Sequence, residues 1–312
     1  MTALPMNRRD ALRLMTAAAI SGIGVLPDGA GAANGADQPG MLARRIPSNG
    51  ESLPMIGLGT WQTFDVGTAP AERAPLEAVL KEFVALGGRL IDSSPMYGNS
   101  EIVAGDLTAA LGLRQKLFIA TKVWTSGKRA GIEQMEDSMG KLRADPIDLM
   151  QVHNLVDVST HLATLREWKQ IGRVRHIGVT HYAASAHDAV ARVISGEPVD
   201  FIQINYSVGE REAERRLLPL ARDRGVAVII NRPFAGGDMF RRLRSKPLPG
   251  WAAEIDCDSW AQLLLKFVVS HPAVTCAIPA TARVEHLRDN MKAGMGRMPD
   301  EKMRARIAAE AA

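Results

Sequence analysis

The sequence predicts an α/β protein, an eight-stranded parallel β/α (TIM) barrel preceded by a short N-terminal β-hairpin. Two observations support this prediction. Short apolar runs recur at intervals of about 25 to 33 residues, with a last interval of about 48, and the segments between them have helical periodicity. The runs end near Gly59, Ile91, Thr121, Val152, Val179, Ile204, Ile230 and Ile278. Eight alternations of strand and helix fit this architecture best.

The elements follow in order along the chain. Residues 42–46 and 52–55 flank the segment Pro47-Ser48-Asn49-Gly50-Glu51, and Asn-Gly between two short runs favours a hairpin. Periodicity and capping residues then predict helices at 75–86, 101–111, 131–142, 160–170, 184–194, 210–222 and 259–270. The helix-prone tail 299–312 is expected either to border the active site or to pack on the outside of the barrel.

A doubly wound open sheet is the alternative to a barrel. A dinucleotide-binding sheet of that kind carries G-x-G-x-x-G after its first strand. Here Gly57-Leu58-Gly59-Thr60-Trp61 lacks the third glycine and is not followed directly by a helix, so the barrel is favoured. In a barrel the interval at about 231–259, too long for an ordinary connection, would overhang the active-site mouth as a lid. Trp251 in this interval either completes the pocket wall or anchors the loop.

The composition is that of a soluble globular protein, with 46% apolar and 23% charged residues, and predicts one large domain over residues 42–312. A net charge of +4, spread along the chain, does not indicate nucleic acid and suits an anionic cofactor equally well. We expect a monomer. The spacing of Cys257 and Cys276 fits no metal motif, and two buried thiols are favoured over a single bridge.

The N-terminus has the pattern of an export signal. Arg8-Arg9 precedes a small-residue apolar stretch at 14–26 and then Ala30-Gly31-Ala32, an A-x-A cleavage pattern. This resembles a twin-arginine signal peptide, which predicts a signal at 1–32, a flexible lead-in at 33–41, engagement of the export machinery and a periplasmic protein. The alternative is a basic tail on a cytoplasmic protein. The stretch is too short for a transmembrane anchor.

Four polar residues follow the ends of successive apolar runs: Asp92, Tyr97, Lys122 and His153. If the runs are parallel strands, these side chains converge on one rim of the sheet. An ammonium beside Tyr97 would lower the pKa of its hydroxyl toward the working range, and Asp92 would keep Lys122 charged. His153 would donate a hydrogen bond to a carbonyl oxygen. With no obvious nucleophile present, the natural reactant is a hydride from a bound cofactor.

Each of these residues also has an ordinary structural explanation. Asp92 alone would cap the next helix, Tyr97 would be a loop aromatic, Lys122 a strand-end charge and His153 a core histidine. Their joint occurrence favours a site. A barrel hydrolase using Asp92 and Glu101 is the weaker enzymatic alternative, because it gives Tyr97 and Lys122 no role. No metal is expected, because the histidines form no ligand-like cluster in the sequence.

Four motifs resemble those of the aldo-keto reductases. They are Gly57-Leu58-Gly59-Thr60-Trp61, the run from Asp92 to Glu101, Ala120-Thr121-Lys122-Val123-Trp124, and Asp148-Leu149-Met150-Gln151-Val152-His153-Asn154. The resemblance extends from about Arg45 to Asn290. It implies a β/α barrel that reduces carbonyl compounds with a nicotinamide cofactor. Tyr97 would be the general acid/base, Lys122 and Asp92 would tune it, His153 would orient the carbonyl, and Trp61 and Trp124 would line the substrate pocket.

The resemblance also implies a cofactor site with several departures from the family pattern. The cofactor-binding residues would be Gly59, Thr60, Thr180, His181, Gln203, Asn231, Arg232, Pro233, Arg283, His286 and Asn290. Asn231 stands where many members have a tyrosine that stacks on the nicotinamide, which leaves Phe234 or Arg232 to compensate. Ala280 replaces a common lysine, so Arg283 and, less strongly, His286 would bind a 2′-phosphate. NADPH is preferred, with NADH as the alternative.

These substitutions keep a second function open. Some proteins that resemble this family associate with channels, so a cofactor-binding sensor or partner subunit with little turnover is the alternative to an exported NADP-dependent carbonyl reductase.

Overall fold

The structure, a computed structural model, describes residues 40–312. The expected signal at 1–32 and most of the lead-in lie outside the described residues. The hairpin is present as antiparallel strands β1 (Ala43–Arg45) and β2 (Ser52–Pro54). The larger sheet contains eight strands: β3 (Leu58–Gly59), β4 (Leu90–Asp92), β5 (Phe118–Val123), β6 (Ile147–His153), β7 (Val174–His181), β8 (Phe201–Asn205), β9 (Ala227–Asn231) and β10 (Cys276–Ala277).

These eight strands are all parallel and lie in sequence order, and the sheet closes on itself. Parallel bridges Ile56↔Ala277 and Gly59↔Ala280 join its first and last strands. A Cβ at Gly59 would lie 2.9 Å from the carbonyl oxygen of Ile278, so this closure needs glycine. The predicted barrel, its eight strands and its hairpin are confirmed.

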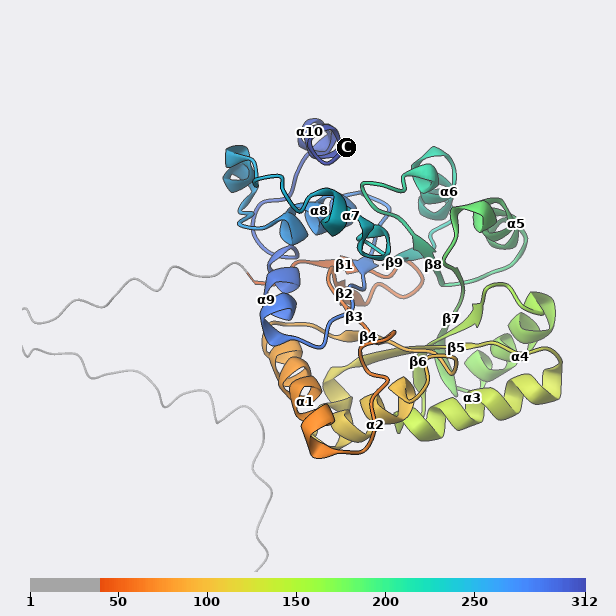
Figure 1. Cartoon of the computed structure of the whole chain (residues 1–312). Coiled ribbons are helices and arrows are strands. Elements are labelled where there is room, and N and C mark those ends of the chain that lie inside the picture. Colours follow the sequence, from red (N-terminus) through yellow and green to blue (C-terminus); the bar gives the residue numbers. More distant parts are fainter. Residues whose placement is uncertain (1–39) are drawn as a thin grey trace, which may run out of the picture. The chain divides into compact units, whose positions relative to one another are not determined.

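The helices surround this barrel (Figure 1). They are α1 (Pro70–Ala85), α2 (Ser100–Ala110), α3 (Lys128–Leu142), α4 (Val158–Gln170), α5 (His187–Gly196), α6 (Leu217–Asp223), α7 (Asp238–Arg242), α8 (Trp260–Val269), α9 (Val284–Lys292) and α10 (Glu301–Glu310). Short 3-10 helices are η2 (Arg114–Lys116), η3 (Ala184–Ala186), η4 (Glu212–Arg215), η5 (Ala235–Gly237) and η6 (Gly250–Ile255). Apolar side chains between helices and strands form the main core, and a smaller cluster fills the barrel.

Two predicted helices differ most from the observed boundaries, and proline explains both. Helix α1 begins at Pro70, five residues before the predicted start, because proline suits the first helical position. The segment 210–222 is not one helix: η4 and α6 are separated at Arg216, whose φ is −144°. The ring of Pro219 would clash with the carbonyl group four residues earlier, at Arg215, if the helix continued through it.

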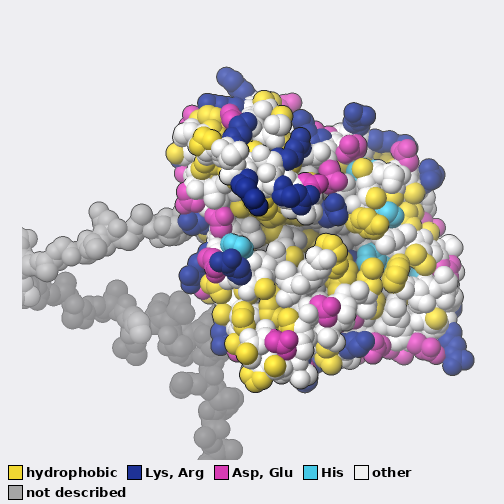
Figure 2. Space-filling model, viewed as in Figure 1, with side chains coloured by type: hydrophobic (Ala, Val, Ile, Leu, Met, Phe, Trp, Pro, Cys, Tyr) yellow, Lys and Arg dark blue, Asp and Glu magenta, His cyan; other side chains and the backbone are white. Residues whose placement is uncertain are grey.

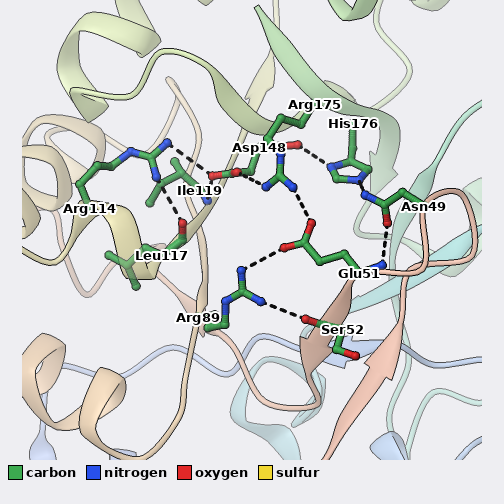
Figure 3. A network of polar contacts seen from close by, with 10 residues as sticks. All are labelled: Asn49, Glu51, Ser52, Arg89, Arg114, Leu117, Ile119, Asp148, Arg175 and His176. Atoms are coloured by element: carbon green, nitrogen blue, oxygen red, sulfur yellow. Dashed lines mark hydrogen bonds and ion pairs between the residues drawn. The ribbon is translucent and has the colours of Figure 1, made fainter. Parts of the chain in front are cut away.

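The hairpin is attached to the N-terminal end of the barrel by a polar network (Figure 3). Glu51 accepts hydrogen bonds from Arg89 at 3.0 Å and from Arg175 at 2.5 Å. Arg175 also donates to Asp148 at 2.6 Å. Ile46 and Leu53 of the hairpin pack into the apolar cluster inside the barrel. The hairpin therefore closes the end of the barrel opposite the strand termini that carry the candidate site.

The long interval after β9 contains η5, α7 and η6, none of which periodicity predicted. Its second half is fastened to the helices outside the barrel. Trp260 Nε1 donates to the carbonyl oxygen of Lys246 at 2.8 Å, and the guanidinium carbon of Arg306 on α10 lies 4.3 Å from the Trp251 ring centroid. Trp251 thus anchors the loop, and the tail packs outside the barrel. The expected role of the interval as a lid stays a prediction.

Cys257 and Cys276 are buried and free, as favoured from the sequence. Across residues 40–312 we find no helix with the length and apolar character needed to cross a membrane.

Candidate active site

The predicted site residues lie together at the C-terminal end of the barrel. Asp92 and His153 are the last residues of β4 and β6, and Lys122 is one residue from the end of β5. The strand register pairs Gly59 with Asp92 and His153 with Thr180. Successive strands therefore deliver these side chains to one rim, where the active sites of β/α barrels lie.

Lys122 and Asp92 form a buried ion pair at this rim. Lys122 Nζ lies 2.7 Å from Asp92 Oδ2 and donates a second hydrogen bond of 2.6 Å to the carbonyl oxygen of Ser93. The Lys122 side chain is 1% exposed and that of Asp92 is 4% exposed. Burial alone would lower the pKa of Lys122, but the charges and hydrogen bonds of Asp92 and Tyr97 together outweigh burial, and the pKa is raised above its ordinary value. Lys122 is therefore a permanent cation in the site.

Tyr97 lies against this cation, with its ring centroid 5.0 Å from Lys122 Nζ. The expectation of a lowered hydroxyl pKa is wrong for this structure. Burial raises the pKa of Tyr97 above 10, and the opposing effect of Lys122 does not overcome it. How deeply Tyr97 is buried could not be predicted from the sequence. The hydroxyl is therefore neutral at ordinary pH and has a proton to donate.

The His153 ring lies next to the Tyr97 ring. The two rings are 6.2 Å apart, edge to face, and the Trp124 ring is 6.3 Å from His153. Burial, with smaller effects from Lys122 and His181, lowers the pKa of His153 to about 3. His153 is therefore a neutral imidazole at ordinary pH, with one N–H to donate.

Two hydrogen bonds to Asp92 and His153 were not predicted. Gln151 Nε2 donates to Asp92 Oδ1 at 3.4 Å, and Ser94 Oγ lies 3.2 Å from His153 Nδ1. Both side chains are fully buried. Gln151 precedes His153 by two residues, so strand alternation places both on one face, and this signal was available in the sequence.

A family model for the aldo/keto reductase family matches residues 55–309. This range contains every site residue described above. The chain belongs to the aldo/keto reductase family.

This aldo/keto reductase is 30% identical over 258 residues to methylglyoxal reductase YeaE of Escherichia coli (strain K12), covering 80% of this chain and 89% of that protein. It is 28% identical over 234 residues to the NADH-specific methylglyoxal reductase of the same strain, covering 64% and 70%. The crystal structure of an aldo-keto reductase from Klebsiella pneumoniae in complex with NADPH aligns with a TM-score of 0.73 and 25% identity, over 86% and 94% of the two chains.

Strands β8 and β9 of this aldo/keto reductase carry buried polar atoms that have no hydrogen-bond partner among residues 40–312. Thr180 Oγ1 donates to Gln203 Oε1 at 2.8 Å, which leaves the buried Gln203 Nε2 unpartnered among the described residues. His181 Nδ1 accepts from the N–H of Ala183 at 3.1 Å, so the ring proton of the neutral imidazole is on Nε2. Asn231 donates to the carbonyl oxygen of His181 at 3.5 Å, and its buried Oδ1 has no partner within residues 40–312.

The other predicted cofactor residues are distributed along the rim. Thr60 is buried and donates to the carbonyl oxygen of Asp92 at 3.0 Å. Arg232 has a buried Nε with no hydrogen bond to any described residue, and its guanidinium nitrogen would lie 3.1 Å from a Cβ at Gly236. Pro233 is buried beside it. Phe234 packs on Phe240 with ring centroids 4.7 Å apart, so it is engaged within its own loop.

The last predicted cofactor residues are on or next to α9. Asn290 is buried at 5% exposure, whereas Arg283 and His286 are exposed. Arg283 Nε donates to Glu285 Oε1 at 2.7 Å. Arg283 is the residue before α9, which α10 follows.

Trp61 and Trp124 are 48% and 41% exposed, so packing in the core does not explain them. Between residues 40 and 312 no set of three or more His, Cys, Asp or Glu side chains is grouped to hold a metal ion.

Proposed function

We propose that this protein reduces an aldehyde or ketone to an alcohol with NADPH, using Tyr97 as the general acid/base. The observation that supports this best is the buried Lys122–Asp92 ion pair beside Tyr97 at the strand termini. A permanent cation next to a buried hydroxyl has a clear use: it stabilises the oxyanion that remains after the hydroxyl has given up its proton.

The proposed proton transfer follows from the charges. Bound NADPH would supply the hydride that adds to the carbonyl carbon. Tyr97, neutral because burial raises its pKa, gives its proton to the carbonyl oxygen. Lys122 lies close enough to stabilise the tyrosinate, and Asp92 keeps Lys122 charged. In the reverse direction the tyrosinate takes the proton back from the alcohol.

His153 would orient the carbonyl group. Its neutral ring can direct one N–H at the carbonyl oxygen without adding a charge that competes with Lys122. The donor draws electron density toward oxygen and makes the carbon a better hydride acceptor. Trp61 and Trp124 provide exposed aromatic surface for the rest of the substrate.

The polar groups on β7, β8 and β9 fit a nicotinamide carboxamide. This group has one carbonyl acceptor and one NH2 donor. Gln203 Nε2 is a buried donor and Asn231 Oδ1 a buried acceptor, and both lack partners in the part of the chain that the structure describes. Burying such groups unpaired costs about 1–3 kcal/mol each, which a bound carboxamide would offset. His181 Nε2–H is a further donor that takes the place of the amide common in the family.

The phosphate groups of the bound NADPH would be held by Lys and Arg side chains. Figure 2 shows Lys and Arg side chains gathered over the region of α7 and α8. Arg283 is suited to a 2′-phosphate because a guanidinium can bind phosphate through two hydrogen bonds. Relatives of this chain include one named as specific for NADH and one solved with NADPH. The choice of NADPH rests on Arg283 and His286.

The twin-arginine pattern leads us to place the protein in the periplasm. Such systems carry folded cargo, so the cofactor would be loaded before export and retained afterwards. Cell fractionation with mass determination of the N-terminus tests this, and finding only unprocessed cytoplasmic protein would defeat it.

The function is tested by extracting bound nucleotide from purified protein and following the absorbance of reduced nicotinamide with a panel of aldehydes, ketones and quinones. Turnover with any of them supports the proposal. Tight cofactor binding without turnover on the whole panel would instead favour the sensor or partner-subunit alternative.

A further inference from the structure

The Ser94 hydroxyl contacts a ring nitrogen of His153, so it can control which ring nitrogen carries the proton. It follows β4 by two residues and is fully buried. Its Oγ lies 3.2 Å from His153 Nδ1 and 3.4 Å from the backbone nitrogen of Met96. Within residues 40–312 these are the only two hydrogen-bond partners of this hydroxyl group.

The direction of the Ser94–His153 hydrogen bond follows from counting donors. The backbone N–H of Met96 can only donate, so Ser94 Oγ accepts there. If His153 Nδ1–H also donated to Oγ, the serine proton would be buried without an acceptor. Buried hydroxyl groups rarely leave their proton unpaired, because this costs about 1–3 kcal/mol. The satisfied arrangement has the Ser94 hydroxyl donating to an unprotonated Nδ1.

The other ring nitrogen then carries the single proton of the neutral imidazole. Nε2 has no hydrogen bond to any residue of the described part of the chain, and the His153 ring is flanked by Tyr97 and Trp124. We propose that Ser94 is a positioning residue that holds His153 in the Nε2–H tautomer and so aims its only N–H at the substrate carbonyl. The opposite tautomer would present a lone pair to the carbonyl oxygen, and the two would repel.

This inference rests on the proposed role of His153 but can be tested apart from it. Histidine labelled with 15N reports by NMR which ring nitrogen is protonated. The chain has seven histidines, and the resonances of His153 are assigned as those lost in His153→Gln. The wild-type protein is expected to show protonated Nε2 and unprotonated Nδ1 at position 153. Protonation at Nδ1 would overturn the inference without any variant, so the test holds even if a Ser94 variant does not fold.

The variants separate control of the tautomer from simple packing. Ser94→Ala removes the donor and should give His153 mixed ring-nitrogen signals and lower kcat/KM for the carbonyl roughly three- to tenfold, the effect of one hydrogen bond. Its Kd for the cofactor should not change. Ser94→Thr keeps the hydroxyl and should restore both the signals and the turnover.

Ser100→Ala is the matched control. Ser100 is equally buried, and its hydroxyl donates to the backbone carbonyl of Thr60 at 3.3 Å rather than to a histidine. The His153 signals of Ser100→Ala should match those of the wild-type protein. Unchanged His153 signals in Ser94→Ala would contradict the inference. The two proposals can also be separated. If the wild-type protein shows the expected tautomer, Ser94→Ala changes it and no carbonyl compound is turned over, the inference about Ser94 is supported and the reductase proposal is rejected.

Discussion

Lys122 Nζ and Asp92 Oδ2 lie 2.7 Å apart with both side chains at most 4% exposed. Removing one member of such a pair leaves an unpaired buried charge. Lys122→Met should therefore reduce the free energy of unfolding by about 3–5 kcal/mol and carbonyl turnover by at least about 100-fold. Urea unfolding and steady-state rates measure the two effects.

The double variant Lys122→Met/Asp92→Asn separates those effects. With neither charge present, most of the stability should return, while turnover stays low because the cation beside Tyr97 is gone. Recovery of turnover in the double variant would show that Lys122 acts only through the fold.

The pKa of His153 predicts a loss of stability toward acid. In the unfolded chain its pKa is near 6.5, and in the folded protein it is about 3. Above pH 6.5 neither state binds the proton; as the pH falls below 6.5, only the unfolded state does. His153 then disfavours the folded state by up to about 1.4 kcal/mol per pH unit.

His153→Gln should make the free energy of unfolding fall less steeply between about pH 7 and pH 5, before most carboxylates titrate. Urea midpoints at several pH values give the two slopes. Equal slopes would mean that the His153 ring is protonated in the folded protein as easily as in the unfolded chain.

The Arg283–Glu285 contact predicts a change in cofactor choice. Glu285 shares the guanidinium that we assign to the 2′-phosphate and adds a negative charge near it. Glu285→Gln should lower the Kd for NADPH about two- to fivefold and leave the Kd for NADH unchanged, a modest effect because both side chains are exposed. Fluorescence titration gives both constants. An equal change in the Kd values for NADPH and NADH would show that Arg283 does not bind the 2′-phosphate.

Asn231 predicts that cofactor stacking can be restored. Where it stands, many aldo-keto reductases have a tyrosine, and Phe234, the aromatic residue nearby in sequence, is packed on Phe240. Asn231→Tyr adds a stacking ring worth about 0.5–1.5 kcal/mol, but it removes Oδ1, the acceptor that we assign to the carboxamide. Because one hydrogen bond contributes about as much as the ring, the Kd for NADPH should stay within about threefold of the wild-type value. Looser binding, measured by the same titration, would indicate that the Asn231 amide contributes more than a ring would.

Much of the fold could be predicted because its strands are short apolar runs at regular intervals. The run ends located all eight strands, since burial on both faces selects such residues. The helix boundaries near Pro70 and Pro219 were harder to predict, because proline can begin a helix, be tolerated within it or interrupt it. The short helices η5, α7 and η6 between β9 and α8 could not be predicted, because contacts with α8 and α10 stabilise that segment more than its own periodicity does.

The site was predictable to the extent that strand ends determine it. Asp92, Lys122 and His153 lie at or next to the ends of successive strands, so topology alone brings them together. Ser94 was missed because a serine next to a turn has many possible partners, and only the fold shows that it reaches His153. The pKa of Tyr97 was predicted in the wrong direction because the sequence contains its cation but not its burial.

Tyr97→Phe tests the central claim most directly. The change removes one hydroxyl and keeps the ring over Lys122. Tyr182→Phe is the matched control, because Tyr182 is 54% exposed. In a single-turnover assay with NADPH already bound, Tyr97→Phe should slow carbonyl reduction at least about 100-fold, while its Kd for NADPH and the rate of Tyr182→Phe stay near the wild-type values. Reduction by Tyr97→Phe at the wild-type rate would contradict the account.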